Sequence, residues 1–275
     1  MPKDQIIVRL NPDVPPTGSD LGITNAARRS FGRRSEWDTE AYTTSQGNAG
    51  WRNVLKDKDK RLLEFLARGM TADDFDEFLG QTSESALQDS LADYSSELVS
   101  LLWQWRNTPT HDTPFNHGFF SFEIKAPIFV ARHLVKHEYL IMSEYSRRYI
   151  TDDIEFYQPD EWRMVAEDIK QGSGGVSPLS WTWSTEYYNT LLPVIEQYNY
   201  MVREGIAPEQ ARMILPQSLM TSWTWSGTLG AFANMCKLRL GSDTQAETRY
   251  VAEKVYEELK KQFPIAAPLL VEGVY

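Results

Sequence analysis

The chain has 275 residues, of which 41% are hydrophobic and 24% are charged, a composition typical of globular proteins. Its 28 Lys and Arg residues against 38 Asp and Glu residues give a formal net charge of −10, which argues against a broad surface for nucleic-acid phosphates. Any anionic ligand must therefore meet a local concentration of positive charge.

The first predicted element is a short strand over residues 5–10, which a turn-rich segment ends. A second strand is expected over 119–124, which is rich in aromatic and β-branched side chains. The polar residues 34–57 are interpreted as a loop. The helices expected in this half share helical spacing of apolar residues and cover 23–31, 58–68, 84–106 and, from Pro127 at its first turn, 127–140.

The second half of the chain is predicted to be largely helical. Residues 171–182 are interpreted as a loop that is too short for a flexible domain linker. The helical patterns that follow cover about 184–204, closed by Gly205, and then 208–214, 226–239 and 244–262. Strands near the front and helices behind predict an α+β fold in a single domain over 1–275.

The sign of the charge reverses locally between Arg132 and Tyr149. The charged and histidine side chains of this window are Arg132, His133, Lys136, His137, Glu138, Glu144, Arg147 and Arg148. Arginine and serine supply forked and single donors to phosphate oxygens, so the window is interpreted as a phosphate or nucleotide site. The alternative is an amphipathic helix with surface ion pairs, and charge pattern alone favours that alternative.

The motif KAPIFVAR (125–132), followed by His137, Glu144, Ser146 and Arg148, resembles the signature region of the flavin-dependent thymidylate synthases. Further segments match that family in its order and spacing: AARRSF (26–31), HDTPFNH (111–117), FYQP (156–159), GIAPEQARMILP (205–216) and NMCKLRLGSDTQAE (234–247). The resemblance spans nearly the whole chain apart from a helical insertion at about 68–100. Several motifs in one order are more specific than one short motif.

The resemblance implies an α+β domain with an antiparallel sheet, and it implies roles for matched residues. Arg239 and Glu144 are expected to be catalytic, Arg239 by stabilising negative charge on the uracil ring. The expected contacts to dUMP are His133, Lys136, Glu144, Ser146, Arg147, Arg148, Arg212 and Arg239. The expected contacts to FAD are Ser30, His111, Thr113, Lys136, His137, Glu138, Glu144 and Asn234.

The chain departs from the family pattern at several of these positions. The family's Arg-His-Arg triplet is Lys-His-Glu at residues 136–138, so one planar fork is lost and one charge is reversed. The other departures replace a glutamine, a small residue, an asparagine and an arginine, and they fall at His133, Arg147, Thr228 and Gly230.

The activity that the resemblance implies is alkylation of C5 of dUMP to give dTMP. Methylenetetrahydrofolate would donate the carbon, FAD would be the cofactor and NADPH the reductant, in a homotetramer with shared active sites and without a metal. The altered triplet motivates a first alternative, in which water quenches the methylene and gives 5-hydroxymethyl-dUMP. A second alternative is a non-catalytic nucleotide-binding homologue that has lost its flavin.

Cys236 is the one cysteine, which excludes an internal disulfide framework and a zinc site built on several thiolates. It lies in an apolar helical stretch, which indicates a packing role instead of the exposed thiolate that a nucleophile needs. His133 and His137 lack the nearby carboxylate of a zinc-protease motif. With no secretory signal and no apolar run of about 18 residues, the expected location is the cytoplasm.

Overall fold

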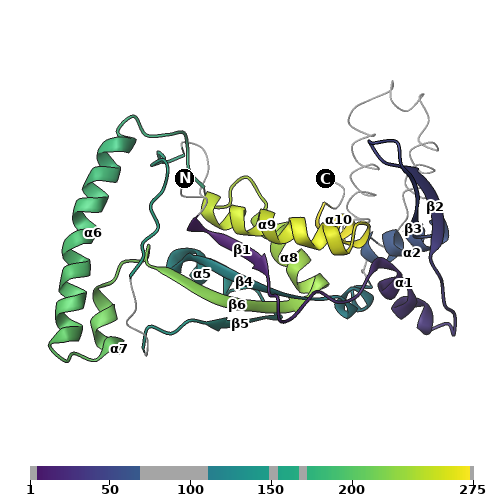
Figure 1. Ribbon diagram of the computed structural model, residues 1–275, viewed down its shortest axis with the longest axis horizontal. Helices are drawn as coiled ribbons and strands as arrows, with labels where there is room; N and C mark the ends of the chain where they lie inside the picture. Colours follow the sequence, from purple (N-terminus) through teal and green to yellow (C-terminus); the bar gives the residue numbers. More distant parts are fainter. Residues whose placement is uncertain (1–4, 69–110, 149–153, 167–171, 273–275) are drawn as a thin grey trace, which may run out of the picture. The chain divides into compact units, whose positions relative to one another are not determined.

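The computed structural model describes residues 5–68, 111–148, 154–166 and 172–272 (Figure 1). The chain divides into two compact units, each assembled from separate segments. Unit 1 contains Met1–Pro16, Phe120–Gly227 and Met235–Glu258, and unit 2 contains Thr17–Phe119, Thr228–Asn234 and Leu259–Tyr275. The helix expected over 84–106 and the insertion expected at 68–100 lie outside the described residues.

Unit 1 is built on a four-stranded sheet. Its strands, in the order in which they lie, are β1 (Ile7–Leu10), β4 (Phe119–Pro127), β6 (Met220–Thr228) and β5 (Leu140–Glu144). The edge pairs β1–β4 and β5–β6 are antiparallel. Burial alternates along β6, so every second side chain points to the covered face of the sheet.

Three helices of unit 1 pack together on one side of this sheet (Figure 1). They are α5 (Ile128–Leu134) and the unit 1 parts of α8 (Leu229–Arg239) and α9 (Ala246–Gln262). Hydrogen bonds join α5 and α8 to α9, one between His133 and Thr248 and one from the Cys236 thiol to the carbonyl of Ala252 at 3.7 Å. This packing places the ends of α5 and α8 near each other.

The remaining helices of unit 1 are α6 (Ser180–Arg203), α7 (Pro208–Ala211) and the 3-10 turn η3 (Arg212–Ile214). The prediction that Gly205 closes a long helix is confirmed, because Gly205 has a φ of +86° directly after the last turn of α6. A small core joins Leu191 of α6 to Phe156 and Leu219.

Unit 2 contains α1 (Asp20–Arg29), α2 (Asp57–Arg68), the 3-10 turn η2 (Thr113–His117), α10 (Ala266–Val271) and a hairpin of β2 (Asp38–Thr43) and β3 (Ala49–Val54). A buried network ties α1 to α2: Asp59 accepts hydrogen bonds from Arg28 Nε at 2.8 Å, from the terminal nitrogen of Arg28 and from the Ser35 hydroxyl. Through Ser35, this network holds the segment after α1 against α2.

The predicted α+β class, with an antiparallel sheet and a largely helical second half, is confirmed. Three element predictions were wrong. Residues 34–57, expected as a loop, include the β2–β3 hairpin, whose exposed side chains give no apolar alternation. The helix expected over 127–140 ends at Leu134 because the chain turns into β5, and the helix expected over 226–239 begins at Leu229 because β6 extends to Thr228.

Candidate functional site

Arg239, His137 and His133 form one cluster in unit 1. The Nε–H group of Arg239, at the end of α8, donates a hydrogen bond to His137 Nε2 at 3.0 Å. His137 lies on the turn after α5, where its backbone N–H donates to the carbonyl of Leu134 at 3.1 Å. His133 lies one turn earlier on α5, and its Nδ1 is 3.1 Å from the Thr248 hydroxyl. The structure therefore brings Arg239 to the two histidines of the α5 end, from which the sequence separates it by about a hundred positions.

The electrostatics of this cluster keep both histidines neutral at pH 7. Burial, the positive charge of Arg239 and the neighbouring His133 lower the pKa of His137 to about 4. Burial and then Arg239 also lower the pKa of His133. Burial lowers the pKa of Arg239, while Asp243 acts in the opposite direction. Since His137 Nε2 accepts from a guanidinium, the ring proton of the neutral imidazole belongs on Nδ1.

A second group of predicted residues lies where β5 ends. Glu144, the last residue of β5, is exposed and accepts a hydrogen bond from the Thr221 hydroxyl of β6 at 2.8 Å. Two residues later, the Ser146 hydroxyl lies 3.4 Å from both the backbone nitrogen and Nε of Arg148. The guanidinium of Arg147 lies over the Tyr145 ring, 5.4 Å from its centroid. A hydroxyl and a guanidinium thus share one turn, which is suited to phosphate oxygens.

A pocket of about 830 Å³ in unit 2, here called the α1–α2 pocket, brings together three predicted flavin residues. Ser30 comes from the end of α1, and His111 and Thr113 come from the segment before and within η2. The Phe65 ring stacks on the His111 ring, with centroids 6.1 Å apart and planes 28° apart. The motifs at 26–31 and 111–117, matched separately in the sequence, therefore line one cavity.

The α1–α2 pocket is also positively charged, which the sequence analysis missed. Its lining includes four cationic side chains and no carboxylate among the described residues: Arg28, Arg33, Lys58 and Arg61. Arg28 is compensated by Asp59. A count of charge along 28–34 would have pointed here, because that stretch contains four arginines.

The structure also shows predicted residues outside these groups. Lys136 and Glu138 flank His137 and are exposed, as are Arg212 on η3 and Asn234 on α8. Arg212 Nε donates to the Glu209 carbonyl within its own turn at 3.3 Å. No hydrogen bond or ion pair in the described parts of the chain joins Arg212 to the end of β5.

Thr228 on β6 and Gly230 on α8, two positions where the family has flavin-binding residues, both lie against the side chain of Asn116. The Thr228 hydroxyl donates to Asn116 Oδ1 at 2.7 Å and accepts from the backbone N–H of Ala231 at 3.2 Å. A Cβ atom on Gly230 would lie 2.8 Å from Asn116 Oδ1. The arginine that the family places at this position therefore cannot fit unless Asn116 moves.

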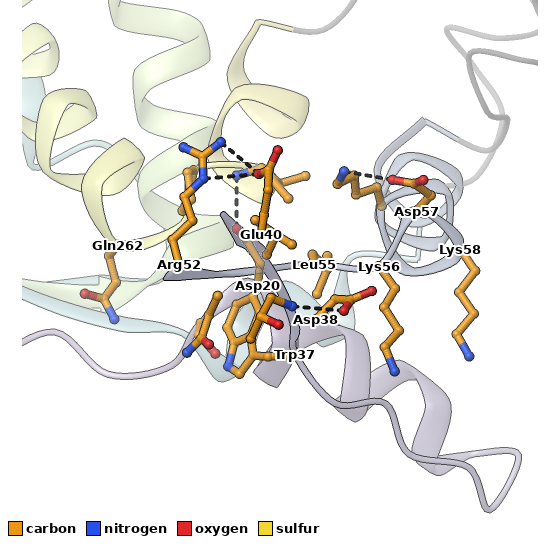
Figure 2. Close-up of a pocket in the computed structure, with 17 residues that line it drawn as sticks. Asp20, Trp37, Asp38, Glu40, Arg52, Leu55, Lys56, Asp57, Lys58 and Gln262 are labelled. Carbon is orange, nitrogen blue, oxygen red and sulfur yellow. Dashed lines mark hydrogen bonds and ion pairs between the residues drawn. The ribbon is translucent and has the colours of Figure 1, made fainter. Parts of the chain in front are cut away.

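A further hollow of unit 2, of about 910 Å³, lies beside the hairpin (Figure 2). Its charges balance, because Arg52 pairs with Glu40 at 2.9 Å and Lys60 pairs with Asp57 at 2.8 Å. Figure 2 shows the pair of Arg52 and Glu40, and it shows Lys56 and Lys58 extending away from Asp57. The remaining acidic lining residues are Asp20 and Asp38. A hollow lined by four acidic and four basic groups does not favour an anion, and we assign it no role.

Cys236 is fully buried, and burial raises the pKa of its thiol. A protonated, inaccessible thiol cannot act as a nucleophile, so the predicted packing role is confirmed. In the described ranges, no three His, Cys, Asp or Glu side chains come together as a metal site. None of the described helices has the length and apolar character needed to cross a membrane.

Comparisons with known proteins agree with these motifs. The family described as thymidylate synthase complementing protein matches residues 17–265. A flavin-dependent thymidylate synthase of Thermus thermophilus is 36% identical over 161 residues, 57% of each chain. One of Ehrlichia ruminantium is 36% identical over 170 residues, 59% of this chain and 56% of that protein. The matches thus span little more than half the length of these curated relatives.

Among solved structures, a UMP/dUMP methylase, PolB from Streptomyces cacaoi bound with 5-Br dUMP, is similar to this chain with a TM-score of 0.67. The two are 23% identical, and the alignment covers 97% of this chain and 95% of that one. This similarity establishes the fold.

Proposed function

Because this chain belongs to the thymidylate synthase complementing protein family, the family of the flavin-dependent thymidylate synthases, we propose that it methylates C5 of dUMP to give dTMP. The observation that carries the proposal is the α1–α2 pocket, since Ser30, His111 and Thr113 line one cavity of about 830 Å³. Methylenetetrahydrofolate would be the carbon donor and NADPH the reductant.

The α1–α2 pocket fits FAD by its chemistry. Arg33, Lys58 and Arg61 offer positive charge for a diphosphate, and the stacked rings of Phe65 and His111 offer a flat surface for a ring system. When bound, FAD would supply the hydride that completes the methyl group. The further residues that we assign to flavin are Lys136, His137, Glu138, Glu144 and Asn234.

The residues of unit 1 are suited to hold the nucleotide. Ser146 and Arg148 would bind the dianionic phosphate, with His133, Lys136, Arg147 and Arg212 as further contacts. Arg239 would face the uracil ring, where its positive charge stabilises the negative charge that develops as C5 becomes nucleophilic. Glu144, oriented by Thr221, would lie near the pyrimidine. We expect a homotetramer in which several subunits contribute to each site.

The departures from the family pattern bear on which product forms. Glu138 places a negative charge where the family has an arginine, and Gly230 removes an arginine from the flavin site. Arg33, Lys58 and Arg61 still supply positive charge to the α1–α2 pocket. We therefore propose the methyl product, because flavin binding can survive the altered triplet.

The test is incubation of the full chain with dUMP, methylenetetrahydrofolate, FAD and NADPH, followed by mass analysis of the nucleotide. A methyl product supports the proposal, and omission of the folate is the control that must leave dUMP unchanged. A hydroxymethyl product would replace it with the hydroxymethylase alternative. Unchanged dUMP, together with no flavin absorbance after incubation with FAD, would favour a non-catalytic nucleotide-binding protein.

A further inference from the structure

The guanidinium of Arg239 is hydrogen-bonded to a neutral acceptor, the imidazole of His137. Its Nε–H group donates to His137 Nε2 at 3.0 Å, and the hydrogen bonds of the described residues include none from this guanidinium to a carboxylate. Asp243 attracts Arg239 electrostatically, and no ion pair between the two is found among the described residues. The contact uses only Nε, and among the described residues no hydrogen bond from the two terminal nitrogens is found, so both can donate to a ligand.

The neutrality of the acceptor has an electrostatic consequence. A carboxylate in the place of His137 would orient the guanidinium equally well, but its negative charge would cancel much of the field that Arg239 exerts on a bound ring. A protonated imidazole could not accept the hydrogen bond and would repel Arg239. Only a neutral acceptor fixes the guanidinium and preserves its whole positive charge.

We propose that His137 is a positioning residue for Arg239, which it aims at the pyrimidine through the Nε hydrogen bond without neutralising its charge. The proposal rests on the proposed function, in which Arg239 faces the uracil ring. It gives the middle residue of the triplet a role that does not depend on Lys136 or Glu138. The backbone hydrogen bond from His137 to Leu134 makes the end of α5 the rigid support of this contact.

The groups that face this contact come from several elements. His133 approaches from α5 and Arg239 from α8, and Asp243 acts from the loop after α8. Thr248 on α9 holds His133 through its hydroxyl. As pH falls towards the pKa of His137, near 4, the imidazole takes up a proton and the hydrogen bond is lost. Turnover should therefore show an acid limb that depends on His137.

Three substitutions separate orientation from charge. His137→Gln keeps a neutral acceptor at about the same reach, His137→Leu removes the acceptor, and His137→Glu keeps an acceptor but adds negative charge. We expect kcat to fall about 100-fold in the Leu variant, with a smaller change in KM for dUMP, because misplacement of a catalytic group costs about that much. The Gln variant should recover most of this loss and should lack the acid limb. The Glu variant should stay as slow as the Leu variant.

A measurement without turnover tests the same point. Ultraviolet difference spectra of bound 5-fluoro-dUMP report ionisation of its ring. Wild type and His137→Gln should lower the pKa of the bound ring, while His137→Glu should lower it much less. Melting temperatures of all four proteins, measured in parallel, identify any variant that fails to fold.

The outcomes distinguish this inference from the proposed function. If wild type neither binds 5-fluoro-dUMP nor turns over dUMP, the proposed function fails. If wild type is active and the Gln, Leu and Glu variants all match it, both in turnover and in the shift of the ring pKa, His137 does not position Arg239. A Glu variant faster than the Gln variant would overturn the argument that neutrality matters.

Discussion

Replacement of Asp59 by alanine should destabilise the protein and weaken flavin binding together. The Asp59 side chain is 0% exposed and that of Arg28 is 17% exposed, so the change leaves a largely buried guanidinium without its partner. Breaking a buried ion pair on one side costs about 3–5 kcal/mol. Because Arg28 keeps some access to water, we expect a loss at the lower end, about 3 kcal/mol.

That loss is a substantial share of a total stability of about 5–15 kcal/mol. It corresponds to a fall in Tm of about 6–12 °C, since 1 kcal/mol shifts Tm by about 2–4 °C in proteins approaching this size. Asp59 also holds Arg28 and Ser35, which lie on either side of the segment that lines the α1–α2 pocket. The affinity for FAD should therefore fall as well.

The assay is thermal unfolding with and without FAD, combined with a titration of FAD followed by flavin fluorescence. Asp57→Ala is the matched control, because Asp57 lies two residues earlier on α2 and its side chain is 84% exposed in a pair with Lys60. It should leave Tm and FAD affinity nearly unchanged. Equal melting temperatures for the Asp59 and Asp57 variants would refute the reasoning.

Three further predictions concern activity, pH and packing. Arg239→Ala should lower turnover by about 100- to 1,000-fold with little change in Tm, as measured by steady-state kinetics and calorimetry. The free energy of unfolding should fall as pH drops from about 6.5 to about 4, because the pKa of His137 is lowered in the folded state and the unfolded chain binds protons first. Gly118→Ala should cost about 1–3 kcal/mol in denaturant unfolding, since the new Cβ would lie 2.4 Å from the buried Phe263 ring.

Each of these three predictions has a comparison variant. Arg249→Ala removes an arginine of unit 1 that donates to the Ser242 carbonyl at 3.1 Å, and it should keep normal turnover. His137→Gln should flatten the stability profile between pH 4 and 6.5, and an unchanged profile would contradict the assignment. Gly175→Ala, with nothing within 4 Å of its new Cβ, should be neutral.

Part of the fold followed from local sequence signals. The long helix closed by Gly205 and the strand after Gly118 have strong apolar patterns, and both are present. The β2–β3 hairpin has exposed side chains on both strands, so no buried face marks its period. The end of α5 at Leu134 depends on the pairing of β5 with β6, which is a contact between distant segments.

For the candidate site, too, some features follow from sequence motifs and others arise only from contacts between distant segments. Motif order in the sequence was enough to predict site roles for Ser30, His111, Thr113, Glu144 and Arg239, because a reaction restricts which side chains stand at which spacing, and these roles stay predictions. Which of these groups lie together could be read only from the folded chain.

The hydrogen bond from Arg239 to His137 and the positive lining of the α1–α2 pocket arise between segments far apart in the chain. A net charge of −10 describes the whole chain, whereas the field at a site depends on distance and burial, which a sequence does not contain.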